Sequence, residues 1–115
     1  LNHQLTERGG RLVGATRTAP CYRLYALPGG PPWRPGLVRV AAGGAAIDVE
    51  VWALPAATVG SFLAGIPAPL AIGSVQLADG SQHKGFVCEA IGVEGAEDVT
   101  HHGSWRAALA SRPRA

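Results

Sequence analysis

The clearest alternation of hydrophobic and polar positions runs through residues 45–53. Every second position there is apolar, and the residues between include Asp and Glu. A period of two is typical of a β-strand that has one buried and one wetter face. We therefore predict a strand over this segment, with a dry face formed by Ile47, Val49, Val51 and Ala53.

Glycine and proline divide the rest of the chain into short segments. The sequence contains 16 Gly and 9 Pro, and many of the segments between them are rich in Val, Ile and Leu. Such punctuation is typical of a β-rich chain. Residues 28–36, PGGPPWRPG, are predicted to form a loop because proline lacks the N–H that a strand ladder needs. The further predicted strands cover residues 11–18, 21–27, 36–41, 72–78 and 82–91.

The dipeptide Asp79-Gly80 separates the last two of these strands. An Asp-Gly pair accepts the positive φ angles of a type I′ turn, which joins two antiparallel strands tightly. We therefore predict a β-hairpin over residues 72–91 with a type I′ turn at its tip.

Helical spacing is confined to short segments. Residues 2–8 are compatible with a helix that ends at Gly9-Gly10. A second helix is predicted after Pro55, and a third short one near residues 105–109. Because strands outnumber helices and no strand–helix–strand alternation is visible, we predict a β-rich α+β fold. Its expected form is a small mixed, mostly antiparallel barrel or curled sheet with one or two short helices.

The composition limits the classes of protein to consider. With 115 residues the chain is long enough for one core, so we expect a single domain over residues 1–115. Its 47% hydrophobic and 16% charged residues exclude a disordered chain. No apolar run approaches the roughly 18 residues of a membrane span, and no signal-peptide pattern follows the polar start. Two cysteines, Cys21 and Cys88, are too few for a secreted disulfide scaffold. We therefore expect a soluble cytoplasmic domain with reduced cysteines and no membrane partner.

The basic residues are mostly arginine, and they are dispersed in a chain of formal net charge +2. This pattern lacks the clustered basic residues that are typical of nucleic-acid-binding proteins. An arginine-rich composition does suit small carboxylate ligands. Arg17 and Arg23, from neighbouring predicted strands, are candidates to hold a carboxylate through paired hydrogen bonds, and solvated surface arginine is the alternative.

Two groups of polar residues suggest chemistry but have simpler explanations. Asp48 and Glu50 lie two apart on one strand and could share a proton as an acid–base pair, but a solvated strand face also explains them. His101 and His102 with His83 or His3 could bind a metal, but adjacent loop histidines rarely face one ion. We therefore expect no metal site.

Five further side chains have both a structural and a functional interpretation. Cys88 alternates with apolar residues and has no histidine arranged to activate it, which favours core packing. Trp33 either stacks on a partner or folds over its own domain. Tyr22 and Tyr25 fall on opposite faces of one strand, so only one of them can line a cavity. By itself, His3 would be interpreted as a residue of the N-terminal tail.

Several sequence blocks resemble the C-terminal domain of allophanate hydrolase. The most specific are YRLYALPG at residues 22–29, IPAPLAIG at residues 66–73 and LADGSQHKGFVCE at residues 77–89. The opening LNHQLTERGG and the closing THHGSWRAAL extend the resemblance over nearly the whole chain.

The resemblance implies a fold and a reaction. The fold expected from it is that of the γ-glutamyl cyclotransferases, a small mixed barrel. In that family an amidase domain hydrolyses allophanate to ammonia and N-carboxycarbamate, and the C-terminal domain is implied to decarboxylate the second product. The expected partners are therefore this small anionic substrate and an amidase domain, in the same chain or another. A homodimer stays open, and no metal or organic cofactor is expected.

The resemblance also implies a role for one residue. The family places a catalytic histidine in a PLNHQL-like stretch, and the matching position is His3. Imidazole titrates near neutral pH, so His3 is expected to donate a proton to nitrogen as the C–N bond breaks. The residues expected to hold the dianionic substrate are inferred from charge and proximity alone: Asn2, Arg17, Tyr22, Arg23 and Tyr25.

Two departures from the family pattern qualify these expectations. Cyclotransferases carry a glutamate as general acid–base after the strand that residues 45–53 match, whereas SFLAGIPAPLAIG at residues 61–73 contains no acidic residue. The family domain also opens with a strand and a loop ahead of LNHQL, so part of the site is expected upstream. Two alternatives to the decarboxylase remain: a non-catalytic module that organises amidase subunits, and a stand-alone cyclotransferase-like protein.

Overall fold

The chain is built from short strands and short helices, and the computed structural model describes residues 2–112. The strands are β1 (Arg11–Arg17), β2 (Tyr22–Ala26), β3 (Pro35–Arg39), β4 (Asp48–Ala53), β5 (Leu70–Gln76), β6 (Gln82–Cys88) and β7 (Glu97–Asp98). The α-helices are α1 (Asn2–Glu7), α2 (Ala56–Ala64) and α3 (Trp105–Ala110), and two 3₁₀ helices are η1 (Ala90–Val93) and η2 (Thr100–His102). The predicted strand-rich α+β class is confirmed. No helix among these residues is long and apolar enough to cross a membrane.

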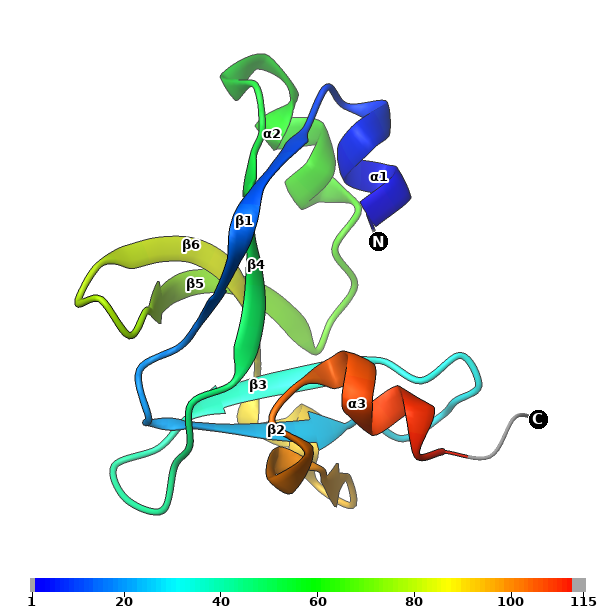
Figure 1. Cartoon of the computed structure of the whole chain (residues 1–115). Helices are drawn as coiled ribbons and strands as arrows, with labels where there is room; N and C mark the ends of the chain where they lie inside the picture. Colours follow the sequence, from blue (N-terminus) through cyan, green and yellow to red (C-terminus); the bar gives the residue numbers. More distant parts are fainter. Residues whose placement is uncertain (1, 113–115) are drawn as a thin grey trace.

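The strands form three small antiparallel sheets in the described part of the chain. β1 pairs with β4, β5 pairs with β6, and β2 lies between β3 and β7. In Figure 1 the β1/β4 ribbon rises from the β3–β2–β7 sheet and carries α1 and α2 at its far end. The expected mostly antiparallel strands are present, but within residues 2–112 they do not close into a barrel.

The sheets are separate because the segments that connect them do not continue a strand ladder. Ala19 and Pro20 lie between β1 and β2, and Pro20 has no N–H with which to extend either ladder. Among the described residues, isolated backbone bridges such as that between Thr18 and Leu77 join the ends of the sheets. A single bridge joins two sheet ends but does not continue a ladder around a barrel.

The β5/β6 hairpin confirms the predicted strands but not the predicted turn. Gly80 has a φ of +89°, whereas no non-glycine residue among residues 2–112 has a positive φ. A type I′ turn needs positive φ at both central residues, so Asp79 excludes it. Instead, the Leu77 carbonyl accepts a hydrogen bond from the Gly80 N–H, and the Leu77 N–H donates to the Ser81 carbonyl. These bonds enclose a three-residue loop that closes with a left-handed glycine, another common hairpin connection.

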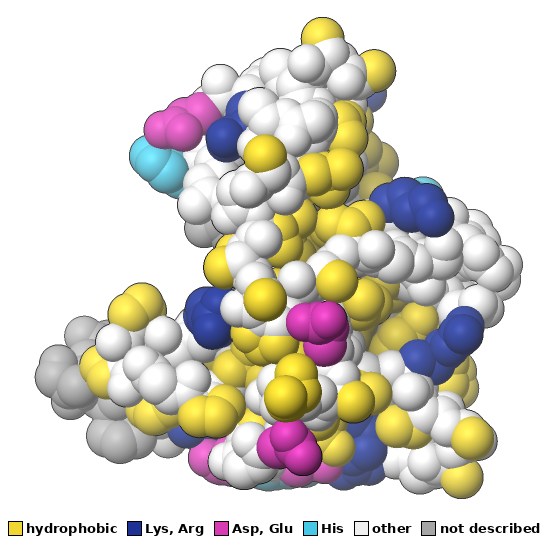
Figure 2. Space-filling view, turned by 180° about the vertical axis from the view of Figure 1, so that it is seen from behind, with side chains coloured by type: hydrophobic (Ala, Val, Ile, Leu, Met, Phe, Trp, Pro, Cys, Tyr) yellow, Lys and Arg dark blue, Asp and Glu magenta, His cyan; other side chains and the backbone are white. Residues whose placement is uncertain are grey.

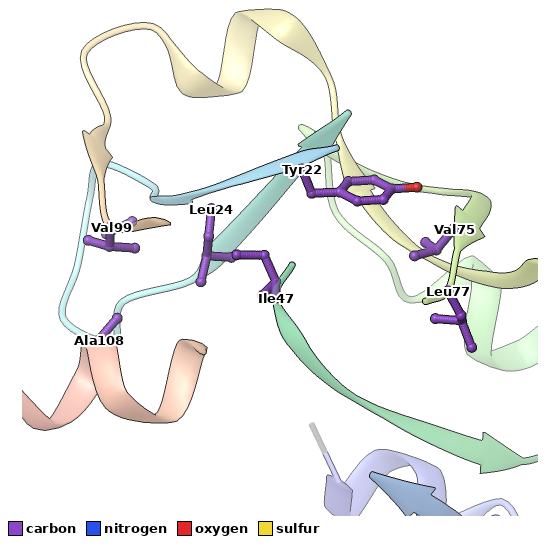
Figure 3. Close-up of a cluster of buried hydrophobic side chains, with 8 residues drawn as sticks. Tyr22, Leu24, Ile47, Val75, Leu77, Val99 and Ala108 are labelled. Carbon is purple, nitrogen blue, oxygen red and sulfur yellow. The ribbon is translucent and has the colours of Figure 1, made fainter. Parts of the chain in front are cut away.

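The main core lies between β2, the start of β4 and the β5/β6 hairpin (Figure 3). Tyr22 is only 1% exposed, and its hydroxyl accepts a hydrogen bond of 2.9 Å from the Gln76 N–H. This bond ties the centre of one sheet to the edge of another. Ile47 is fully buried, and Val49 and Val51 pack against the cluster, which confirms the predicted dry face of that strand. The labelled members of the cluster are Tyr22, Leu24, Ile47, Val75, Leu77, Val99 and Ala108.

Two buried threonines complete hydrogen bonding where the ladders stop. Thr18 Oγ1 accepts a 3.0 Å hydrogen bond from the Ile47 N–H, and Thr100 Oγ1 accepts one of 2.8 Å from the Leu24 N–H. Buried backbone groups are costly when they are left without a partner. The two hydroxyls therefore replace backbone acceptors at the sheet ends.

α1 ends where predicted and packs beside α2. Gly9 has a φ of +80°, and the Gly10 N–H donates a 2.9 Å hydrogen bond to the Leu5 carbonyl. A side chain at Gly10 would bring its Cβ within 2.7 Å of that carbonyl oxygen, so glycine is required there. Phe62 of α2 is buried and meets Phe86 edge to face, with ring centroids 5.8 Å apart. This contact fixes α2 against β6.

Candidate functional site

His3 lies on the outer side of α1. Its side chain is 79% exposed, and its Nε2 lies 3.0 Å from a carboxylate oxygen of Glu7, one helical turn away. A carboxylate beside Nε2 favours the tautomer in which Nε2 carries the hydrogen. Nδ1 is then the nitrogen that is available for proton exchange. The pair therefore provides an oriented imidazole on the surface of the described structure.

Asn2 and Arg17 are placed very differently with respect to His3. Asn2 precedes His3 in α1 and is exposed. Arg17 ends β1, six residues beyond Arg11, which corresponds to about 20 Å of extended strand. Its Nε donates a 2.7 Å hydrogen bond to Asp48. Arg17 is therefore far from α1 and already has a carboxylate partner.

Arg23 and Tyr25 belong to a second ion-pair cluster. Arg23 Nε donates a 2.6 Å hydrogen bond to Asp98, and a terminal nitrogen of the same guanidinium bonds the Gly43 carbonyl. Burial alone would raise the pKa of Asp98, but hydrogen bonds from Arg23 and Thr100 outweigh it and lower that pKa to about 2. The hydrogen bond to Asp98 also raises the pKa of Arg23, with a smaller contribution from Tyr25. This cluster holds β2 to β7.

Tyr22 faces the other side of β2, in the core. It also lines a hollow of about 440 Å³ between β3 and the β5/β6 hairpin, which we call the Arg39 hollow because Arg39 lies at its wall. Tyr22 is therefore the tyrosine of this strand that lines the Arg39 hollow. Among the described residues, His3 and the five predicted substrate-binding residues do not gather in one pocket, so their roles stay predictions.

A second hollow, of about 250 Å³, lies between the end of α2 and β5. We call it the α2 hollow, and its lining residues all have apolar side chains: Leu63, Ile66, Leu70, Ala71 and Ile72. Strand β5 borders both hollows, because Gly73 and Ser74 line the Arg39 hollow. In Figure 2 hydrophobic side chains are exposed along the middle of the back face of the molecule.

Arg39 is a candidate that sequence reasoning missed. It pairs with Tyr22 across the β2/β3 ladder, so the two side chains share a face. The signal in the sequence was weak, because the strand was predicted as residues 36–41 with no register to its neighbour. The register, and with it the face on which Arg39 lies, comes only from the structure.

The polar pair Asp48 and Glu50 lies on a solvated strand face. Asp48 pairs with Arg17, and Glu50 accepts a 3.2 Å hydrogen bond from the Trp52 indole. Arg106 lies 3.5 Å from the other Glu50 oxygen. Each carboxylate has its own partner, so they are not arranged as an acid–base pair. Within residues 2–112 no three His, Cys, Asp or Glu side chains are grouped to hold a metal ion.

The remaining candidates have structural roles. Cys88 is buried, and burial raises the pKa of its thiol, which disfavours a nucleophilic thiolate. Both cysteines are free thiols, as predicted. Trp33 stacks on the chain's own Arg112, whose Cζ lies 4.2 Å from the ring centroid. The proline-rich loop is thereby folded against the end of α3.

Comparisons with known proteins agree along the whole chain. A family model described as the allophanate hydrolase C-terminal domain matches residues 1–110. A urea amidolyase of Saccharomyces cerevisiae is 40% identical over 111 residues, which are 93% of this chain and 6% of that protein. A urea amidolyase of Lachancea kluyveri is 39% identical over 107 residues. The chain thus spans about 6% of the length of these curated relatives.

Two solved structures show the same fold. The allophanate hydrolase of Kluyveromyces lactis superposes with a TM-score of 0.91 at 38% identity, over 96% of this chain and 19% of that one. The protein c4763, described as specific to uropathogenic E. coli, gives a TM-score of 0.88 at 39% identity, over 98% of this chain and 87% of that one. The sequence blocks, the family model and these structures agree, and the chain belongs to the allophanate hydrolase C-terminal domain family.

Proposed function

We propose that this domain removes CO₂ from N-carboxycarbamate, the product that an amidase domain releases from allophanate in the cytoplasm. The observation that carries the proposal is the match over residues 1–110 to a domain found within allophanate-hydrolysing enzymes. The amidase domain is its expected partner, in the same polypeptide or in another. Together the two activities convert allophanate to ammonia, CO₂ and carbamate, and the carbamate then breaks down to ammonia and CO₂.

The reaction requires one proton for the substrate nitrogen. Binding requires positive charge opposite the two substrate carboxylates. N-carboxycarbamate, ⁻O₂C–NH–CO₂⁻, takes a proton on nitrogen while one C–N bond breaks. The electron pair of that bond stays on nitrogen, CO₂ leaves, and carbamate, H₂N–CO₂⁻, remains. A proton donor that titrates near neutral pH favours this step because nitrogen is then a better leaving group.

His3 is the proposed donor. Glu7 lies 3.0 Å from its Nε2, which orients the ring and leaves Nδ1 as the nitrogen that delivers the proton. Asn2, on the same helix, is the nearest of the proposed substrate-binding residues along the chain. Arg17 and Arg23 bind the substrate only if its carboxylates displace Asp48 and Asp98. Tyr22 and Tyr25 are the other two proposed substrate-binding residues.

The test follows the lifetime of N-carboxycarbamate directly. An isolated amidase domain is fed carbon-13-labelled allophanate, and the intermediate is observed by carbon NMR with and without this chain. The chain is expected to shorten the lifetime well beyond the spontaneous rate. His3→Ala is expected to abolish that effect, whereas His83→Ala, an exposed histidine of β6, is the matched control and should leave it unchanged.

The outcomes separate the reaction from the residue. An unchanged lifetime in the presence of the chain overturns the decarboxylase proposal. A shortened lifetime that His3→Ala leaves intact overturns only the role of His3.

A second candidate function is assembly with the amidase domain, without chemistry. The observation that favours it is the α2 hollow, beside which Leu63 is 43% exposed. Contiguous exposed apolar surface marks interaction sites. Leu63→Asp is expected to weaken binding to the amidase domain at least tenfold in calorimetry, whereas Leu109→Asp, on the exposed side of α3, should not. Equal effects of the two variants would rule out the α2 hollow as the surface that binds the amidase domain. Sedimentation of the chain alone shows whether it forms a homodimer.

The cyclotransferase alternative has less support. Residues 51–78, which include α2 and β5, contain no Asp or Glu. A general acid–base carboxylate therefore has no source in the segment where that fold family carries one. Incubation of the chain with a γ-glutamylamine tests this alternative, and release of the amine would revive it.

A further inference from the structure

The Arg39 hollow combines a rigid apolar wall with one polar rim. The ring of Tyr22 forms part of the wall and is fixed by its hydrogen bond to the Gln76 N–H. Leu37 and Val87 add apolar surface from β3 and β6. At Gly73 a Cβ would lie 3.3 Å from a Val87 methyl, so glycine leaves the space beside Val87 open. The cavity is therefore shaped by neighbouring strands of two sheets and not by a mobile loop.

Arg39 is the unpaired charge of this hollow. Within the described residues, Arg17, Arg23, Arg106 and Arg112 each pair with a carboxylate, whereas Arg39 has no such partner. It is the guanidinium that lines the hollow.

The other charged groups nearby do not neutralise Arg39. Lys84 donates a 2.9 Å hydrogen bond to the Ser74 hydroxyl at the same hollow, which adds positive charge. Glu89 and Arg34 lie near Cys88 and act on its thiol in opposite directions, Glu89 more strongly. The part of the hollow beside Arg39 and Ser74, where Arg39 and Lys84 supply positive charge, therefore favours an anion.

We infer that the Arg39 hollow binds a small organic carboxylate, separately from His3. A guanidinium forms two parallel hydrogen bonds to a carboxylate, and this geometry distinguishes a carboxylate from a neutral amide of the same size. The apolar wall of Tyr22, Leu37 and Val87 accommodates a short hydrocarbon stem. A volume of about 440 Å³ falls within the range of small-molecule pockets.

Butyrate is the probe for the test, and butyramide is its uncharged equivalent. The full chain is titrated with each, and the methyl resonances of Leu37 and Val87 are followed by NMR. Butyrate is expected to shift them saturably, whereas butyramide should not. Arg39→Gln is expected to weaken butyrate binding at least tenfold. Arg11→Gln removes the same charge from an exposed position at the start of β1 and should change the affinity by less than twofold.

Three results would overturn the inference. The first is butyrate shifts that do not saturate or that spare Leu37 and Val87. The second is an affinity that Arg39→Gln leaves unchanged. The third is an equal loss in Arg39→Gln and Arg11→Gln, which would mean a general effect of net charge. Because Arg39 is exposed at the rim, its replacement should leave the fold intact, and the dispersion of the amide spectrum checks this.

Discussion

The lower and upper parts of the molecule in Figure 1 differ in how they are stabilised. The lower part, which we call the core region, consists of β2, β3, β7, η2 and α3. It contains Tyr22, Leu24, Val99 and Ala108, all almost fully buried. The upper part, the ribbon region, consists of β1, β4, α1 and α2, and neither of its strands has a fully buried residue.

The ribbon region instead exposes apolar side chains. Leu12 and Val13 of β1 are 50% and 59% exposed, and Leu63 of α2 borders the α2 hollow. Its own burial comes from Leu5 and Phe62. A two-stranded ribbon is marginally stable by itself, so it depends on what packs against it. The core region therefore stabilises the fold, whereas the ribbon region exposes apolar surface.

The largest expected effect comes from a matched pair of leucines. Leu24→Ala removes a buried side chain and leaves a cavity, so the free energy of unfolding should fall by about 2–5 kcal/mol. Leu12→Ala changes a half-exposed side chain and should cost no more than about 0.5 kcal/mol. Urea denaturation of the full chain measures both. Equal losses would show that the two regions do not differ in this way.

A smaller effect is expected from a buried hydroxyl. Thr100→Val keeps the shape of the side chain but leaves the Leu24 N–H without its acceptor, at a cost of about 1–3 kcal/mol. Thr16→Val is the control in β1 and should change stability by no more than about 0.5 kcal/mol. The comparison would fail if the control were the more damaging substitution.

The smallest of the three losses should come from Asp98, and it depends on pH. The pKa of Asp98 is about 2 in the folded protein against an ordinary value of 3.8, so its ionised form stabilises the fold. That contribution is complete above about pH 4 and is lost as the pH falls towards 2. Because Asp98 is about one third exposed, Asp98→Asn should cost only about 1 kcal/mol at pH 7.

Denaturation at pH 7, 4 and 2.5 checks this prediction. The difference between the wild type and Asp98→Asn should shrink at pH 2.5. A difference that stays constant with pH would mean that Asp98 acts through packing and not through its charge.

Local structure was largely readable from the sequence. The alternation at Ile47 and Val49 predicted both the strand and its buried face, and Gly9-Gly10 predicted the end of α1. The turn at Asp79 was not predicted correctly, because an Asp-Gly pair suits more than one hairpin connection. The separation of the strands into three sheets was not predictable, because strand propensity does not say which strands pair.

The candidate site was less predictable, because its partners are distant in sequence. Arg17 and Arg23 were expected to hold a carboxylate of the substrate, yet each pairs with a carboxylate of the chain itself, Asp48 and Asp98, which lie 31 and 75 residues away. Arg39 required the register between β2 and β3. His3 was singled out only through the family resemblance, since an isolated histidine on a short helix has no local pattern that reveals a role.

The position of β5 between the two hollows has a thermodynamic consequence. Ala71 and Ile72 line the α2 hollow, and the next two residues, Gly73 and Ser74, line the Arg39 hollow. An occupant that shifts β5 at one hollow changes the affinity at the other, and linkage requires the same factor in both directions. A protein bound at α2 would then change the affinity for a carboxylate near Arg39, and the carboxylate would change the affinity for the protein. Strand β5 would carry both effects.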